Sequence, residues 1–358
     1  MQINKYFKEL NIEPISEVNI REKCEFANGV AMVMVEKLAD YNLDYLKIVD
    51  ILQHTEMYIA KIPKNLSPVN YSYLDGKMYI SEDIKLDVRN EFVLHEVIHR
   101  IQEYRNKKEK LLQLGLCDVM ETKIKGLALN EAAVQYIVQR ILNGEIKVID
   151  IYGMKVPTLS KNYYPILTNL IQQITFLIGE DKLIDSTINS NNEFKYQTID
   201  MLGEDTYNAI ESSFEQILEA KNKILKNKDK SIIDENIDLI KNGYINIQNK
   251  IMTSYFNKEF KRIKSMEQLK DFNVKLLKYK DYIGLNEVQA SYVEFFDAMQ
   301  EQIKEKEQSF INKSLIVVKE SRIGKVFNRI KNYIKSLVFQ NWKSSWNNKF
   351  QGLLKKYF

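Results

Sequence analysis

The chain has 358 residues, of which 45 % are hydrophobic and 28 % are charged, so it can bury a sizeable core in about two domains. This composition excludes a wholly disordered chain, a collagen-like chain and a disulfide scaffold. The 52 basic and 48 acidic residues give a formal net charge of +4, which is too small to indicate a nucleic-acid partner.

No segment predicts export or membrane insertion. The first residues contain no apolar run of signal-peptide length, and no stretch approaches about 20 uncharged apolar residues. Two cysteines, Cys24 and Cys117, form neither a metal-ligand spacing nor a disulfide framework. We therefore expect a cytoplasmic protein without a transmembrane helix.

The first half of the chain predicts short helices followed by a small β region. Residues 1–54 have apolar periodicity typical of helices, and residues 58–62 have a strand-like pattern that Pro63 ends. The segments on either side of Asp75-Gly76 predict a β-hairpin over residues 71–81.

The rest of the chain favours helices. We expect helices over residues 86–107 and 127–142, the second closed by Asn143-Gly144, and one more strand over residues 146–151. From Pro165 onward the pattern is helical, and the lysine-rich residues 221–234 indicate a linker or an exposed turn. The predicted fold class is α+β and predominantly helical.

One motif carries chemistry. His95-Glu96-Val97-Ile98-His99 places two histidines four residues apart in a helical pattern, so both imidazoles lie on one face and can bind one ion. Tetrahedral zinc accepts such a pair and leaves positions for a third ligand and a water molecule, beside which Glu96 can act as general base. On a helical wheel the ligand stripe and the apolar back are separate. The stripe contains Phe92, His95, Glu96, His99 and Glu103, and the back contains Leu94, Val97, Ile98 and Ile101.

The third ligand is predicted to be Glu131. Its carboxylate projects from an otherwise apolar stripe of the next helix, and burial without a partner would cost several kcal/mol. Small residues at Ala128, Ala132 and Ala133 would let the two helices approach closely. The alternatives are His54, which is more typical of an ordinary surface histidine, and two further carboxylates, Asp118 and Glu121.

These residues resemble the gluzincins, the thermolysin-like clan of zinc metallopeptidases, over roughly residues 55–180. The resemblance rests on the motif His95–His99 and on Asn130-Glu131 in the next predicted helix. It implies that His95, His99 and Glu131 bind Zn²⁺ and that Glu96 activates water. By analogy with the clan's sheet, the hairpin would supply an edge strand that binds an extended peptide or protein substrate.

The chain departs from the clan in two places. One turn after the glutamate ligand the thermolysin pattern has an aspartate that orients a zinc histidine, whereas this chain has Gln135, whose amide oxygen could do the same without charge. No later histidine is present to stabilise the oxyanion, so a tyrosine or an arginine would have to substitute if the reaction is proteolysis. Tyr163 and Tyr164 are the candidates, as is Tyr136.

The end of the chain is basic and amphipathic. No acidic residue follows Glu320, and both tryptophans lie in this part, as do the basic residues Arg322, Lys325, Arg329, Lys331, Lys335, Lys343, Lys349, Lys355 and Lys356. Such a segment suits an anionic membrane surface or an acidic partner, or it is a last helix with solvated lysines. We expect a zincin-like domain over residues 1–195, a helical domain over 196–321 and this segment over 322–358.

The sequence therefore supports two functional hypotheses. The first is zinc-dependent hydrolysis of a peptide or other amide bond, with Glu96 as general base. The alternative is a helical interaction or scaffold protein with a structural or vestigial metal site. Residues 322–358 could place such a protein at a membrane surface.

Overall fold

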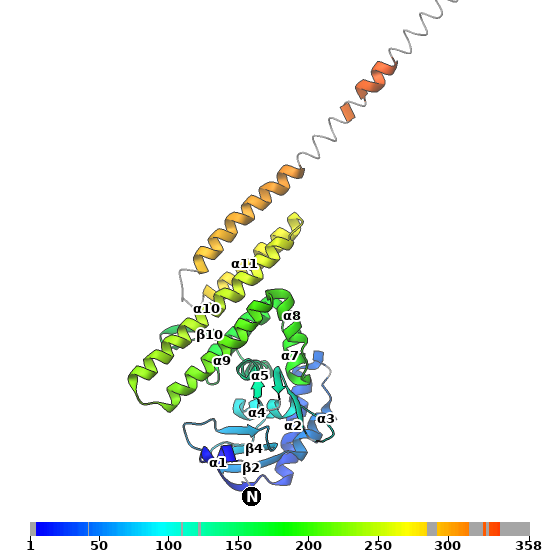
Figure 1. Cartoon of the computed structure of the whole chain (residues 1–358). Coiled ribbons are helices and arrows are strands. Elements are labelled where there is room, and N and C mark those ends of the chain that lie inside the picture. Colours follow the sequence, from blue (N-terminus) through cyan, green and yellow to red (C-terminus); the bar gives the residue numbers. More distant parts are fainter. Residues whose placement is uncertain are drawn as a thin grey trace, which may run out of the picture. The chain divides into compact units, whose positions relative to one another are not determined.

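The computed structural model describes residues 5–41, 43–108, 110–120, 123–284, 292–314, 325–326 and 329–336. Over these ranges the chain is predominantly helical with small sheets, which confirms the predicted fold class (Figure 1). Its contacts divide it into two compact units, one of residues Met1–Arg262 and Lys275–Val293 and the other of Ile263–Val274 and Glu294–Phe358. The motif and everything that surrounds it belong to the first unit, whereas the predicted domain boundaries stay predictions.

A four-stranded sheet lies in the first part of the chain. Its strand order is β1-β2-β4-β3, in which β2 and β4 are parallel and the other pairs are antiparallel. The strands are β1 (Glu13–Glu17), β2 (Glu56–Lys61), β3 (Val69–Ser72) and β4 (Lys77–Ser81). The predicted strand and hairpin are confirmed, and Gly76 supplies the left-handed conformation (φ 70°) that the hairpin turn requires. Strand β3 is an edge of this sheet.

Two smaller β structures follow, and the sequence patterns predicted only part of them. Strands β5–β8 form a second antiparallel sheet in chain order, and β9 pairs with β10 as a hairpin. Their bounds are β5 (Glu103–Arg105), β6 (Leu111–Leu114), β7 (Cys117–Met120), β8 (Lys123–Lys125), β9 (Lys147–Ile151) and β10 (Met154–Thr158). The strand predicted over residues 146–151 is confirmed as β9.

Helices make up most of the remaining described residues. They are α1 (Lys5–Glu9), α2 (Ile20–Lys37), the 3₁₀ helix η1 (Ala39–Tyr41), α3 (Tyr45–His54), α4 (Glu91–Ile101), α5 (Leu127–Ile141), α6 (Pro165–Ile178), α7 (Asp181–Asn189), α8 (Glu193–Leu202), α9 (Glu204–Lys226), α10 (Lys230–Arg262) and α11 (Met266–Gly284), and residues 292–314 are also helical. The lysine-rich segment does contain a turn, at residues 227–229, but its first six residues are the end of α9. No helix in the described ranges is both long and apolar enough to cross a membrane.

The motif helix α4 is shorter than predicted at both ends. Asn90 caps its start, because the Asn90 side chain accepts hydrogen bonds from the backbone N–H groups of Phe92 and Val93 at 3.0 and 3.3 Å. After Ile101 the chain turns into strand β5, which pairs with β6 and so competes with helix continuation. Glu103 therefore lies on a strand and not on the ligand stripe of the helix.

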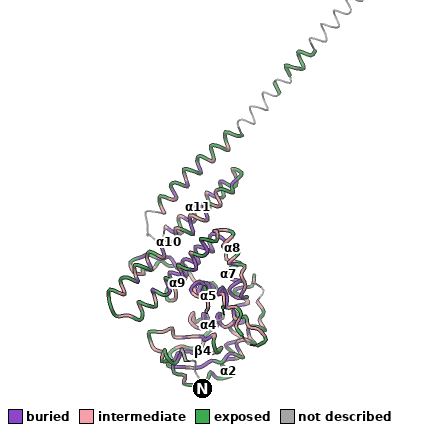
Figure 2. The backbone as a smooth tube through the Cα atoms, viewed as in Figure 1, coloured by how far each residue is buried: buried purple, intermediate pink, exposed green. Residues whose placement is uncertain are grey.

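The back of α4 packs in the main hydrophobic core, as predicted. Val93, Leu94, Val97 and Ile98 are fully buried, together with apolar residues of α2, α5 and the first sheet. Figure 2 shows α4 and α5 largely in the buried colour. Burial of this face fixes the rotation of α4 about its axis, and this determines the direction in which the opposite stripe with the two histidines faces.

Helix α5 begins without a side-chain cap of its own. Its N-cap is Gly126, in a left-handed conformation (φ 85°), and the free N–H of Ala128 instead donates to the Glu215 carboxylate of α9 at 3.0 Å. An ion pair of 2.8 Å between Lys125 and Glu211 adds a second link to the same helix. Helix α9 is thereby held against the start of α5, although the two are far apart in sequence.

The basic segment over residues 322–358 is described only at residues 325–326 and 329–336, which are helical and exposed. The other residues of this segment, including both tryptophans, lie outside the described residues. Its role at a membrane surface or with an acidic partner stays a prediction.

Replacing Asn90 by alanine should lower the free energy of unfolding by about 1 kcal/mol, because two N–H groups at the start of α4 lose their acceptor. Urea denaturation measures this, with Arg89→Ala as an exposed neighbouring control. Asn90→Asp should retain the stability of the unaltered chain. Equal stability of Asn90→Ala and Arg89→Ala would contradict the capping role.

Candidate metal centre

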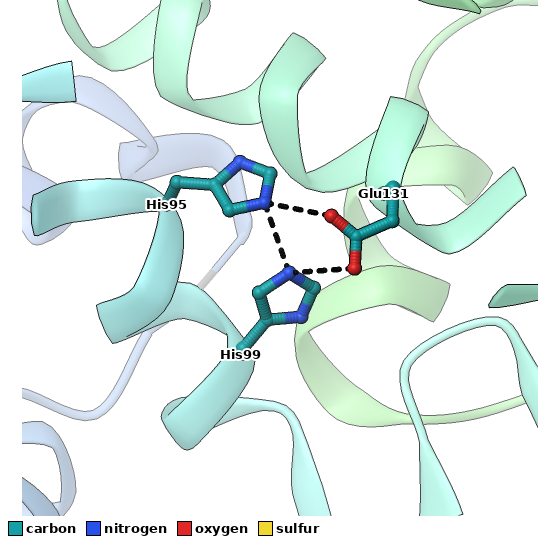
Figure 3. Close-up of side chains that lie close together, drawn as sticks. All are labelled: His95, His99 and Glu131. Carbon is teal, nitrogen blue, oxygen red and sulfur yellow. Dashed lines mark hydrogen bonds and ion pairs between the residues drawn. The ribbon is translucent and has the colours of Figure 1, made fainter. Parts of the chain in front are cut away.

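Three side chains from α4 and α5 converge on one point (Figure 3). The Nε2 atoms of His95 and His99 are 3.0 Å apart, and the Glu131 carboxylate places one oxygen 3.0 Å from His95 Nε2 and the other 3.3 Å from His99 Nε2. Both histidines are buried, and the Glu131 side chain is 14 % exposed. The structure thus brings together the three residues that the sequence analysis predicts as ligands.

The donor atoms fit a tetrahedral metal ion. Ligand atoms about 2.0–2.1 Å from zinc lie roughly 3.3–3.4 Å from one another in a tetrahedron, close to the separations found here. Two Nε2 atoms that face each other also need an electropositive group between them, because lone pairs at this distance repel. His95, His99 and Glu131 thus form a group, among the described residues, that could hold a metal ion.

Burial and mutual charge shift the pKa values of the three groups in different directions. Burial lowers the pKa of His95. Burial also acts to lower the pKa of His99, but the Glu131, Glu96 and Glu103 carboxylates outweigh it and the pKa is raised. Burial acts to raise the pKa of Glu131, but the two histidines outweigh it and hold the pKa well below its ordinary range. Glu131 is thus an anion ready to bind a cation.

A glutamine amide backs each imidazole. Gln135 Oε1 lies 3.0 Å from Nδ1 of His95, and its amide nitrogen donates to Ser160 Oγ at 2.8 Å, which fixes the amide with the oxygen toward the histidine. A proton on Nδ1 leaves Nε2 free for a metal, so Gln135 occupies the orienting position that the sequence analysis gave it.

His99 has a corresponding neighbour, Gln102, whose amide nitrogen lies 2.9 Å from Nδ1. A metal on Nε2 requires the proton on Nδ1, so the amide must turn over to present its oxygen, which is buried and has no partner among the described residues. The sequence analysis did not find Gln102, because it lies just past the helical stripe.

A close approach behind the centre requires a glycine. A Cβ atom at Gly115 would lie 2.2 Å from Asn130 Oδ1 and 2.5 Å from Gln102 Oε1, and its φ of 54° is left-handed. Asn130 Oδ1 accepts a hydrogen bond from the N–H of Leu116 at 3.0 Å, so Asn130 and Glu131 have different roles. Asn130 holds the turn between β6 and β7, and Glu131 faces the histidines.

Glu96 lies beside the centre and contacts the edge strand. Its carboxylate accepts the backbone N–H of Tyr71 in β3 at 2.9 Å. Burial raises the pKa of Glu96 to about 8, against the lowering effects of His99 and of this hydrogen bond. The Tyr71 hydroxyl in turn donates to the buried Glu103 carboxylate, which also pairs with Arg100 and Arg105. The edge strand is therefore fixed relative to α4.

The centre opens into a cavity of about 350 Å³, which we call the main cavity. Glu96, His99 and Glu131 form one wall, and residues of β3, including Tyr71, form another. Two predicted residues, Tyr163 and Tyr164, also line it, and the Tyr163 ring packs edge-on against the His95 ring at 4.5 Å between centroids. The other tyrosine candidate, Tyr136, is not among these lining residues, and its hydroxyl donates to Glu180.

Helix α9 also contributes to the lining of the main cavity, which the sequence analysis missed. Lys221, Asn222, Leu225 and Lys226 line the main cavity from its last turns. The sequence analysis interpreted this segment as a linker because it is lysine-rich with few apolar residues. Only the contacts of α9 with the start of α5 show that it covers the centre.

Of the alternative ligands, His54 and Asp118 do not join the cluster. His54 is exposed at the end of α3, where its Nδ1 lies 2.8 Å from the Asp50 carbonyl oxygen. Asp118 pairs with Lys195 at 3.1 Å. Glu121 lies outside the described residues.

Comparisons with known proteins add no relative. No family model matches the chain, no curated protein matches it, and no solved structure matches it. What can be said of the centre therefore rests on its own geometry. It is a buried His-His-Glu cluster with an acidic residue beside it, open to a cavity.

Replacing Gln135 by leucine should weaken zinc binding about 10- to 100-fold, because His95 loses the acceptor that sets its tautomer. Competition with a zinc chelator measures the affinity. Gln139→Leu is the matched control. Gln139 lies one turn after Gln135, and its buried amide donates a hydrogen bond to Glu91 without touching a proposed ligand. An equal loss in both variants would contradict the orienting role of Gln135.

Zinc affinity should decrease as the pH is lowered. The decrease should begin at a higher pH than for an ordinary histidine ligand, whose pKa is about 6.5. Zinc requires a neutral His99, and the raised pKa of this ring lets protons compete sooner. Below that pKa we expect a loss of about tenfold per pH unit. Chelator competition between pH 6 and 8.5 tests this, and a constant affinity across the range would contradict it.

Proposed function

We propose that the chain is a zinc-dependent peptidase, or at least an amide hydrolase. The observation that carries the proposal is the convergence of His95, His99 and Glu131 at ligand spacing, with Glu96 beside them in the main cavity. A zinc ion held there would lower the pKa of a bound water molecule toward about 7 and polarise the carbonyl of the bond to be cleaved.

Glu96 is suited to be the general base. Its carboxylate lies in the wall of the main cavity, and burial makes it more basic than an ordinary glutamate. A general base works best when its pKa is near the pH of reaction, and burial shifts the pKa of Glu96 upward in that direction. Glu96 would take the proton from water and then pass it to the leaving amine.

Tyr163 and Tyr164 are suited to stabilise the oxyanion. Burial raises the pKa of both hydroxyls well above the ordinary tyrosine value, with the Glu131 carboxylate adding to the effect. Both hydroxyls thus stay protonated and can donate hydrogen bonds at neutral pH. Hydrogen-bond donors that face a developing negative charge in a site shielded from water contribute strongly to catalysis.

Strand β3 would hold the substrate. It is an edge of the first sheet and its residues Asn70 and Tyr71 line the main cavity, so an extended peptide could add to it as a further strand. The Tyr71 N–H is already used by Glu96, so peptide pairing would rely on the other backbone groups of this edge.

Glu96→Gln tests the proposal, because it removes the base without removing a zinc ligand. The variant should keep stoichiometric zinc and lose about 10²- to 10⁴-fold in hydrolysis. Metal analysis and cleavage of denatured casein measure the two properties, with Glu22→Gln on an exposed position of α2 as the matched control. A zinc-loaded chain with no cleavage would favour the interaction protein with a structural metal. An unimpaired Glu96→Gln variant would contradict the role of Glu96 as general base.

A further inference from the structure

The charges of the main cavity are not all explained by the metal centre. Among the described residues that line it, the carboxylates are Glu96 and Glu131, and the proposed function uses both. The lysines are Lys221 and Lys226, both on the last turns of α9, and the proposed function uses neither. With a dication bound, this cavity would carry excess positive charge and would attract an anionic ligand.

Lys221 is the deeper of the two lysines. It is partly buried, and its ammonium group lies 4.3 Å from the centroid of the Tyr164 ring and 5.9 Å from that of Tyr163. It forms no ion pair or hydrogen bond with any described residue. Burial lowers its pKa, and the Glu131 carboxylate acts in the opposite direction. Among the described residues only the faces of these two rings stabilise the partly buried charge, and no carboxylate pairs with it, so the ammonium group is available to an anionic ligand in the main cavity.

A second cavity adjoins Lys221 and differs in character. It has a volume of about 70 Å³, shares Tyr164 and Lys221 with the main cavity, and is otherwise lined mainly by aliphatic side chains such as Ile166, Leu218 and Ile240. An ammonium group is thus placed beside an apolar cavity. The last residue of a peptide presents the complementary groups, since its carboxylate and its side chain are joined to one carbon atom.

We infer that Lys221 binds a carboxylate group of the substrate, so the site recognises anionic peptides. This inference rests on the proposed function, because it names the substrate class of the same site. The carboxylate has two possible sources, the chain terminus and an aspartate or glutamate side chain. The apolar cavity beside Lys221 favours the terminus, with an aliphatic last residue whose side chain enters that cavity.

The test measures peptide binding in zinc-loaded Glu96→Gln, which separates recognition from hydrolysis. Isothermal titration calorimetry compares acetyl-Ala-Ala-Val as the free acid and as the terminal amide. It also compares acetyl-Ala-Glu-Val-amide with acetyl-Ala-Gln-Val-amide. We expect the free acid to bind at least tenfold more tightly than its amide, and no such difference within the second pair. A preference confined to the second pair would assign Lys221 to a side-chain carboxylate and overturn the terminal one.

Substitutions at Lys221 then locate the preference. Lys221→Met should bring the ratio of acid to amide affinity close to one, and Lys221→Arg should retain most of it. Lys223→Met, on an exposed position of the same helix that does not line the cavity, is the matched control and should keep the full ratio. Thermal unfolding should show that Lys221→Met stays folded, because among the described residues the ammonium group loses only its contacts with the Tyr163 and Tyr164 rings.

The outcomes separate this inference from the proposed function. If the unaltered chain cleaves casein but the zinc-loaded Glu96→Gln variant binds the acid and the amide equally, only the role of Lys221 is overturned. The same holds if the ratio of acid to amide affinity is unchanged in Lys221→Met. Selective binding of the acid without any cleavage overturns only the hydrolase. Lys221→Met with a lower kcat on amidated and free peptides alike would assign the lysine to the oxyanion instead. Failure of both peptides to bind overturns the inference.

Discussion

The mutual approach of two imidazoles and one carboxylate is the constraint on which this structure depends. Their donor atoms lie 3.0–3.3 Å apart in a setting where both rings are buried. Such an approach is unfavourable without a cation or a shared proton among the donors. The surrounding structure opposes relaxation, because the apolar back of α4 is fixed in the core and α5 is held at its start by carboxylates of α9.

Segments far apart in sequence complete the cavity around this centre. The edge strand β3 precedes the motif, Tyr163 and Tyr164 follow the β9–β10 hairpin, and the last turns of α9 lie some 120 residues beyond the motif. Tyr164 adopts a left-handed conformation (φ 49°) just before Pro165 begins α6, and the Tyr163 ring meets the His95 ring. The residues that line the cavity therefore extend well beyond the motif helix and the helix that follows it.

The centre itself could be predicted from sequence because its signals are local. The four-residue spacing places His95 and His99 on one face, and a lone carboxylate on an apolar stripe marks Glu131. Gln135 was predicted only by comparison with the thermolysin pattern, which has an aspartate one turn after the glutamate ligand. The ends of α4 could not be predicted from periodicity, since the Asn90 cap and the pairing of β5 with β6 decide them. Lys221 could not be predicted either, because nothing in a lysine-rich stretch indicates which lysine another helix will cover.

The amides behind the imidazoles have a consequence for the electronic character of the centre. A carboxylate in that place would push electron density through the ring and weaken the pull of a bound ion on its remaining ligands. Gln135 orients the His95 ring without supplying that density, and Gln102 would do the same for His99 once its amide has turned over. An ion held in the proposed centre would therefore be more strongly Lewis-acidic and would dissociate sooner than in a carboxylate-backed centre, so that the proposed hydrolysis and the sensitivity to chelators would rise together.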